Sequence, residues 1–112
     1  MLQFHEIEKY AYSYTLTNND VAAKLSLWKT TTDNNEVKVA DINFMYDNDI
    51  IPAPVIQDDA EYALLYMPVK TLLGIIDILR NEKPLILTLN APFAFLGTNA
   101  LEPVGDGEPL SV

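Results

Sequence analysis

The stretch EYALLYMPVKTLLGIIDILRNEKPLILTLN, residues 61–90, contains a buried strand, one amphipathic helix and a second strand in close succession. Residues 61–67 are apolar on both faces of an extended chain, at Ala63, Leu64, Leu65 and Met67. A strand of this kind is typical of the centre of a sheet that is covered on both sides. The stretch therefore predicts a sheet with a helix packed on it.

The helix is expected to begin at Pro68, because proline suits the first helical turn, and to end near Arg80. One broad apolar stripe predicts its buried face: Val69, Leu72, Leu73, Ile76 and Leu79. Ile75 and Ile78 fall outside this stripe, which indicates that the helix buries more than one face. Gly74 costs about 1 kcal/mol relative to alanine inside a helix. A close approach of the helix to the sheet is the expected reason for this glycine.

Three strands are expected before this stretch, at residues 7–17, 21–30 and 37–46, because apolar and polar residues alternate there. The alternation of the third strand changes phase near Ala40, which predicts a bulge that curls the sheet. Residues 50–60 contain Pro52 and Pro54, so this segment is expected to run irregularly along an edge.

A final hairpin is expected at residues 85–90 and 93–98, followed by an irregular C-terminal segment at 99–112. Residues 1–112 are expected to form a single domain. The element order β-β-β-β-α-β-β predicts an α+β fold: a curled antiparallel sheet, or a small partly open barrel, of about six strands with a single helix packed on it.

The chain is acidic along its whole length. Sixteen Asp and Glu stand against seven Lys and Arg, which gives a formal charge of −9. Such a surface repels nucleic-acid phosphates and anionic lipids, so no nucleic-acid and no membrane partner is expected. No apolar run approaches the ~20 residues that cross a bilayer, and the N-terminus does not resemble a signal peptide, so a cytoplasmic location is expected.

The sequence contains no recognisable catalytic set. It has no cysteine, and its lone His5 is expected to lie near a mobile N-terminus. Neither a cofactor nor a metal site is predicted, and an enzyme is less expected than a noncatalytic protein.

Tyr10, Tyr12 and Tyr14 form a stripe on one face of the first predicted strand. Such a face serves as core with its hydroxyls at the rim, as a subunit interface, or as a site that stacks ligand rings. The sequence leaves these three roles open. It makes the stripe a candidate interface.

A second candidate site is the charged end of the predicted helix, where Arg80, Asn81, Glu82 and Lys83 precede Pro84. Glu102 and Glu108 of the acidic C-terminal segment could pair with its basic residues, so these six residues are predicted to form a structural clasp or a site.

The segments ILRNEKP (78–84) and EPVGDGE (102–108) resemble a group of small uncharacterised bacterial proteins that end in a similar helix, hairpin and Glu-Pro-Val-Gly segment. The resemblance covers about the C-terminal half of the chain. It implies a bacterial cytosolic protein and no particular activity.

Three functions remain open from the sequence. The first is a small acidic interaction module that pairs with itself or with a protein partner. The second is a small-molecule binder or enzyme that uses a pocket between the sheet and the helix. The third is an acidic inhibitor that mimics nucleic acid and binds a basic protein.

Overall fold

The computed structural model describes residues 1–17, 20–47, 50–98 and 104. These residues form eight strands, a short 3-10 helix and one α-helix. In chain order the elements are β1 (Leu2–Glu6), β2 (Lys9–Tyr14), β3 (Val21–Thr30), β4 (Glu36–Met45), β5 (Val55–Ile56), β6 (Ala63–Pro68), η1 (Val69–Thr71), α1 (Leu72–Asn81), β7 (Ile86–Asn90) and β8 (Phe93–Gly97).

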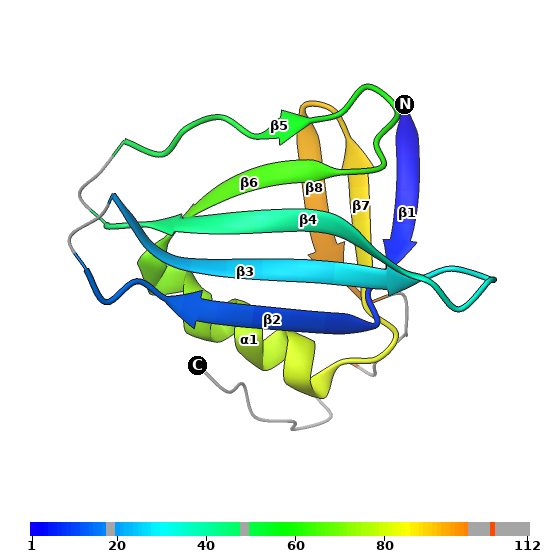
Figure 1. Cartoon of the computed structure of the whole chain (residues 1–112), viewed down its shortest axis with the longest axis horizontal. Coiled ribbons are helices and arrows are strands. Elements are labelled where there is room, and N and C mark those ends of the chain that lie inside the picture. Colours follow the sequence, from blue (N-terminus) through cyan, green and yellow to red (C-terminus); the bar gives the residue numbers. More distant parts are fainter. Residues whose placement is uncertain (18–19, 48–49, 99–103, 105–112) are drawn as a thin grey trace.

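The strands form two sheets. Sheet A has three strands in the order β1-β7-β8, and sheet B has five in the order β2-β3-β4-β6-β5. All pairs are antiparallel except β4 and β6, which run parallel. In Figure 1 the strands of sheet A cross behind those of sheet B, and α1 lies behind the lower strands of sheet B. Sheet B is therefore one layer, and sheet A and α1 share the other.

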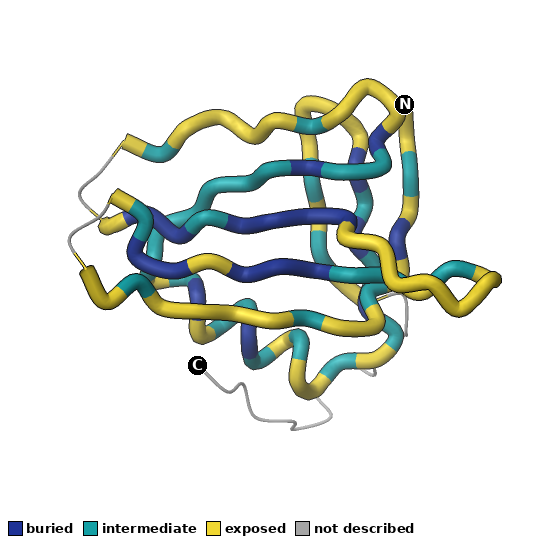
Figure 2. The backbone as a smooth tube through the Cα atoms, in the orientation of Figure 1, coloured by how far each residue is buried: buried dark blue, intermediate teal, exposed yellow. Residues whose placement is uncertain are grey.

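The core lies between these layers. β3 and β4 are its most deeply buried strands, as the dark segments of Figure 2 show. The second layer contributes Leu87 and Leu89 from β7 and Leu72 and Ile76 from α1 to the same cluster. Sheet A and α1 thus both depend on the inner face of sheet B for their burial.

The α+β class with a single helix is confirmed for the described residues, but the predicted single sheet is wrong. The structure has two sheets, and they do not close into a barrel. The strand count was too low because β1 and β5 were missed. β1 pairs with β7, so that Leu2 lies opposite Asn90, and a pairing so distant in sequence leaves no local signal.

The parallel pair β4–β6 also corrects the expected antiparallel arrangement. After β4 the chain turns back as far as β5, which pairs antiparallel with β6 at the edge of sheet B. The chain then turns once more, so that β6 runs in the direction of β4. Pro52 and Pro54 lie in the returning segment, as expected for an edge.

The predicted bulge is confirmed close to its expected position. Leu27 lies opposite Ala40 and Trp28 opposite Lys38, which leaves Val39 without a partner in β3. The extra residue shifts the side-chain alternation of β4.

The helix follows its predicted stripe only in part. Leu72 and Ile76 are buried, but Leu73 is 64% exposed. At 100° per residue Leu73 lies well away from Leu72 around the helix, on the side opposite Ile75, and Ile75 and Leu79 pack against the core in its place. The expected close approach at Gly74 is also wrong, because a Cβ added there would meet no atom within 4 Å.

Residues 99–112, the predicted irregular segment, lie outside the described residues except for Val104. Among the described residues, no helix is long and apolar enough to cross a membrane.

Replacement of Gly74 by alanine should stabilise the protein. The space for a methyl group is free, and alanine reduces the backbone entropy of the unfolded chain, so the free energy of unfolding should rise by about 0.5–1 kcal/mol. Urea denaturation followed by circular dichroism measures this change. A loss of stability would show that the helix needs the glycine for a contact.

Candidate functional site

The outer face of sheet A is apolar and uncovered by the described residues. We call this surface the phenylalanine face; it is made of Leu2, Phe4, Ile86, Thr88, Phe93 and Phe95. Phe4 is 66%, Phe93 58% and Phe95 61% exposed. Their neighbours along each strand point the other way, into the core. A three-stranded sheet packed on one side thus carries large apolar side chains on both.

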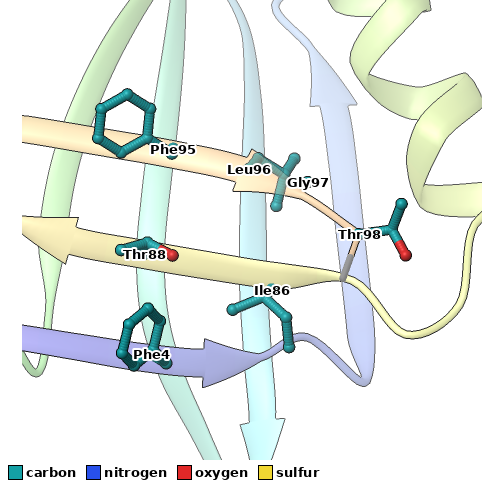
Figure 3. Close-up of a pocket in the computed structure, with 7 residues that line it drawn as sticks. All are labelled: Phe4, Ile86, Thr88, Phe95, Leu96, Gly97 and Thr98. Atoms are coloured by element: carbon teal, nitrogen blue, oxygen red, sulfur yellow. The ribbon is translucent and has the colours of Figure 1, made fainter. Parts of the chain in front are cut away.

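The phenylalanine face is hollowed near one end. The hollow has a volume of about 390 Å³. Figure 3 shows Phe95, Thr88 and Phe4 side by side across the three strands, with Ile86 beside Gly97. Gly97 lies opposite Ile86 in the β7–β8 pair, and its missing side chain leaves open space there. The face therefore combines exposed rings with a hollow that can receive one.

A second apolar depression separates β8 from α1, with a volume of about 430 Å³. We call it the β8–α1 cleft. Sheet B forms its floor through Ile42 and Leu65, and Ile75 and Ile78 line it from α1. Leu96 lines it from β8. The two isoleucines outside the predicted helical stripe thus face a cleft between sheet and helix, where the sequence expected a pocket for a small molecule.

The outer face of sheet B is polar in comparison. At its centre Asp41 accepts hydrogen bonds of 2.5 Å from the hydroxyls of Ser26 and Tyr62. The Lys38 ammonium lies 3.5 Å from the same carboxylate and 5.4 Å from the centre of the Trp28 ring. Asp41 is only 6% exposed, and each of its two carboxylate oxygens accepts a hydrogen bond in place of water.

The pKa values of this cluster follow from its bonds. Burial raises the pKa of Asp41, but the hydroxyls of Ser26 and Tyr62 and the nearby lysines more than offset it, so the pKa is lower than 3.8. Burial and the Asp41 carboxylate together raise the pKa of Tyr62 to about 12. Neither group is poised to exchange a proton near neutral pH. This favours a structural role for the network over a catalytic one.

His5 is buried rather than near a mobile end. It is 2% exposed, and its Nε2 lies 2.7 Å from the carbonyl oxygen of Ala60. A carbonyl only accepts, so Nε2 carries the proton and Nδ1 accepts from Lys29 at 3.3 Å. Lys29 also lies 3.3 Å from Glu61. The imidazole therefore joins β1 to the turn before β6.

The predicted tyrosine stripe shares one face of β2, opposite inner-face residues of β3. Tyr10 packs against the core. Tyr12 and Tyr14 are 50% and 52% exposed and contact each other edge to face at 6.1 Å. One tyrosine thus belongs to the core, and the role of the other two as an interface stays a prediction.

The predicted clasp is described only in part, because Glu102 and Glu108 lie outside the described residues. Asn81 donates to the backbone and side-chain oxygens of Asp77, both at 2.9 Å, and so caps the end of α1. The positive charge of Lys83 interacts electrostatically with Glu6 of β1. The neighbouring Glu8 raises the pKa of Glu6, and Lys83 partly opposes this shift. Arg80 and Glu82 have no described side-chain ion pair.

The sequence did not reveal the phenylalanine face. The available signal was the i, i+2 spacing of Phe93 and Phe95, together with Leu2 and Phe4, which places each pair on one side of a strand. The two pairs form one surface only because β1 pairs with β7, and the sequence did not predict that pairing.

No group of three potential metal ligands occurs among the described residues.

No family, no curated protein and no solved structure compared with this chain matches it.

Loss of the buried imidazole should destabilise the fold. In His5→Leu the buried carbonyl of Ala60 loses its donor, so the free energy of unfolding should fall by about 1–3 kcal/mol. His5→Gln should recover part of the loss, because its amide can occupy the place of Nε2, whereas the shorter His5→Asn should not. Urea denaturation measures all three variants. Equal stability of the three would contradict the assigned bond.

The Asp41 network should make stability depend on pH in the acid range. Its folded-state pKa is lowered, so its contribution is present above the pKa of the unfolded chain and is lost as pH falls through the folded value. The stability difference between wild type and Asp41→Asn should therefore be largest near neutral pH and narrow below about pH 4. Asp58→Asn, at an exposed turn outside the network, is the matched control and is measured over the same pH range. Urea denaturation at each pH measures the difference in the free energy of unfolding between wild type and Asp41→Asn. A difference that stays constant across this pH range would refute the prediction.

Proposed function

We propose that the protein is a small noncatalytic interaction module that pairs with a second copy of itself through the phenylalanine face. The observation that carries this proposal is the exposure of Phe4, Phe93 and Phe95, each by more than half, on one side of sheet A. A contiguous exposed apolar surface of this kind on a small domain is typical of an interaction site.

The composition of the face supports a protein partner. Among its outward strand residues only Glu6, at one end, carries a charge. Depletion of charge and enrichment of aromatic residues are the features that distinguish the centre of an interface from other surface. By contrast, the outer face of sheet B carries Lys9, Lys24 and Lys38.

The shape of the face supports a second copy as that partner. In a two-fold pair the same surface meets itself, so each protomer must supply both a projection and a recess. The phenylalanine face has both: rings that stand out at Phe4 and Phe95, and the hollow beside Gly97. A ring of one protomer can enter the hollow of its partner.

The charge of the chain sets the expected salt dependence. Two chains of formal charge −9 repel one another, and salt screens this repulsion. Pairing through an uncharged face should therefore strengthen as salt is added. Such behaviour separates this proposal from the acidic inhibitor, whose binding to a basic protein would weaken with salt.

The other two functions have less support. The β8–α1 cleft has the volume of a small-molecule site, but no charged residue lines it to orient a polar substrate. The acids of the described residues occur in separate elements of the chain, for example in turns at Asp33 and Asp58 and on α1 at Asp77. This scatter does not favour a nucleic-acid mimic. A cytosolic location remains part of the proposal.

Replacement of Phe4 by serine should weaken self-association. Sedimentation velocity over a range of concentrations should show a monomer–dimer equilibrium for the wild type, which shifts toward dimer at high salt. Phe4→Ser should shift it toward monomer by at least about tenfold in Kd, since buried aromatic anchors dominate interfaces. Phe95→Ser should act in the same direction.

Tyr12→Ser is the matched control, because Tyr12 is also half exposed on an edge strand. It should leave the equilibrium unchanged if the phenylalanine face is the interface. A stronger effect of Tyr12→Ser than of Phe4→Ser would move the interface to the tyrosine stripe. A wild type that stays monomeric at every concentration would reject self-association.

A further inference from the structure

We propose that the β8–α1 cleft binds an extended apolar peptide segment flanked by basic residues, which adds as a strand to the free edge of β8. This site borders the phenylalanine face, with which it shares Phe93 and Phe95, but it lies at the strand edge, and its test does not depend on self-association.

The first ground is the edge of β8. β8 pairs with β7 on one side and is the last strand of sheet A on the other. No backbone hydrogen bond from another described element reaches Phe93–Gly97. In an antiparallel pair about half of the backbone N–H and C=O groups of a strand point away from its partner. The outward groups of β8 are therefore available to a further strand.

The second ground is what the edge faces. In Figure 1 β8 is the strand of sheet A farthest from β1, on the side where α1 lies. The cleft there is bounded by Leu96 of β8, Ile78 of α1 and Ile42 of sheet B. Its volume of about 430 Å³ can accept the side chains of an added strand that point toward sheet B. Without a bound segment these apolar walls contact water, so their burial favours binding.

The third ground is the surroundings of the two faces of the added strand. Side chains of a strand alternate between its faces. One set would enter the β8–α1 cleft, and the other would lie beside Phe95, which borders both this cleft and the hollow of the phenylalanine face. Both sets should therefore be apolar or small. The five residues of β8 predict a segment of about the same length.

Charge selects the flanks of this segment. No charged residue of either sign lines the cleft, so the flanks of the segment meet the field of the whole chain, whose formal charge is −9. A partner with basic residues on either side of its apolar segment is attracted by this field, and an acidic partner is repelled.

Fluorescence anisotropy of the labelled peptide KKVTVIVKK, titrated with the full chain, tests the proposal. Saturable binding is expected. The same peptide with acidic flanks, EEVTVIVEE, should bind at least about tenfold more weakly at low salt. No binding of the basic peptide, or equal binding of both peptides, would overturn the proposal. Binding of an apolar dye without binding of the peptide would also overturn it and favour a small-molecule site.

Two N-methylated versions of the peptide test strand addition itself. Methylation of alternate residues removes the N–H groups along one edge of the peptide and keeps every side chain. One of the two alternating patterns should weaken binding by at least about tenfold, and the other should not, because only one edge meets β8. Equal effects of both patterns would show that the peptide does not pair as a strand.

Variants on α1 locate the peptide in the cleft. Ile78→Asp places a charge in the wall and should weaken binding by about tenfold or more. Leu73→Asp is the control on the same helix; Leu73 is 64% exposed and does not line the cleft. Equal binding by the two variants would overturn the assignment. Phe4→Ser should bind the peptide as the wild type does, so a failure of self-association leaves this test intact.

Discussion

The burial of Leu87 and Leu89 against the inner face of sheet B is the contact on which the rest of the structure depends. Sheet A consists of three strands of five residues each, and so small a sheet is marginal in water without a covered face. Each buried leucine contributes about 1.5–3 kcal/mol relative to an exposed one. β7 therefore holds sheet A to sheet B, and β1 and β8 are stabilised through their pairing with β7.

The same contact explains where the uncovered apolar surface lies. Sheet A has one layer to pack against, so only one of its two faces is buried. Its other face carries phenylalanines, whereas the outer face of sheet B carries lysines and the bonded Asp41. Each sheet is covered on one side only, and the two outer faces differ: that of sheet A is apolar, and that of sheet B is polar. A polar outer face needs no partner, and an apolar one is stabilised by burial.

Sheet A and α1 sit side by side on sheet B, and a second consequence follows from this arrangement. A cleft remains where β8 and α1 meet on sheet B. Ile75 and Ile78 face this cleft, which accounts for two apolar residues beside the buried stripe of the helix. The edge strand β8 therefore borders both the hollow of the phenylalanine face and the β8–α1 cleft.

The sequence by itself determined the elements whose signals are local: the single helix that ends at Asn81, the bulge near Ala40, the proline-rich edge and the shared face of the three tyrosines. Only the tertiary structure decided the division into two sheets, the parallel β4–β6 pair, the burial of His5 and the phenylalanine face. These features need residues that lie far apart in the chain, such as Phe4 and Thr88, to become cross-strand neighbours. The physical reason is that side-chain periodicity specifies which face a residue takes within its own strand, whereas long-range pairing and burial decide what that face meets.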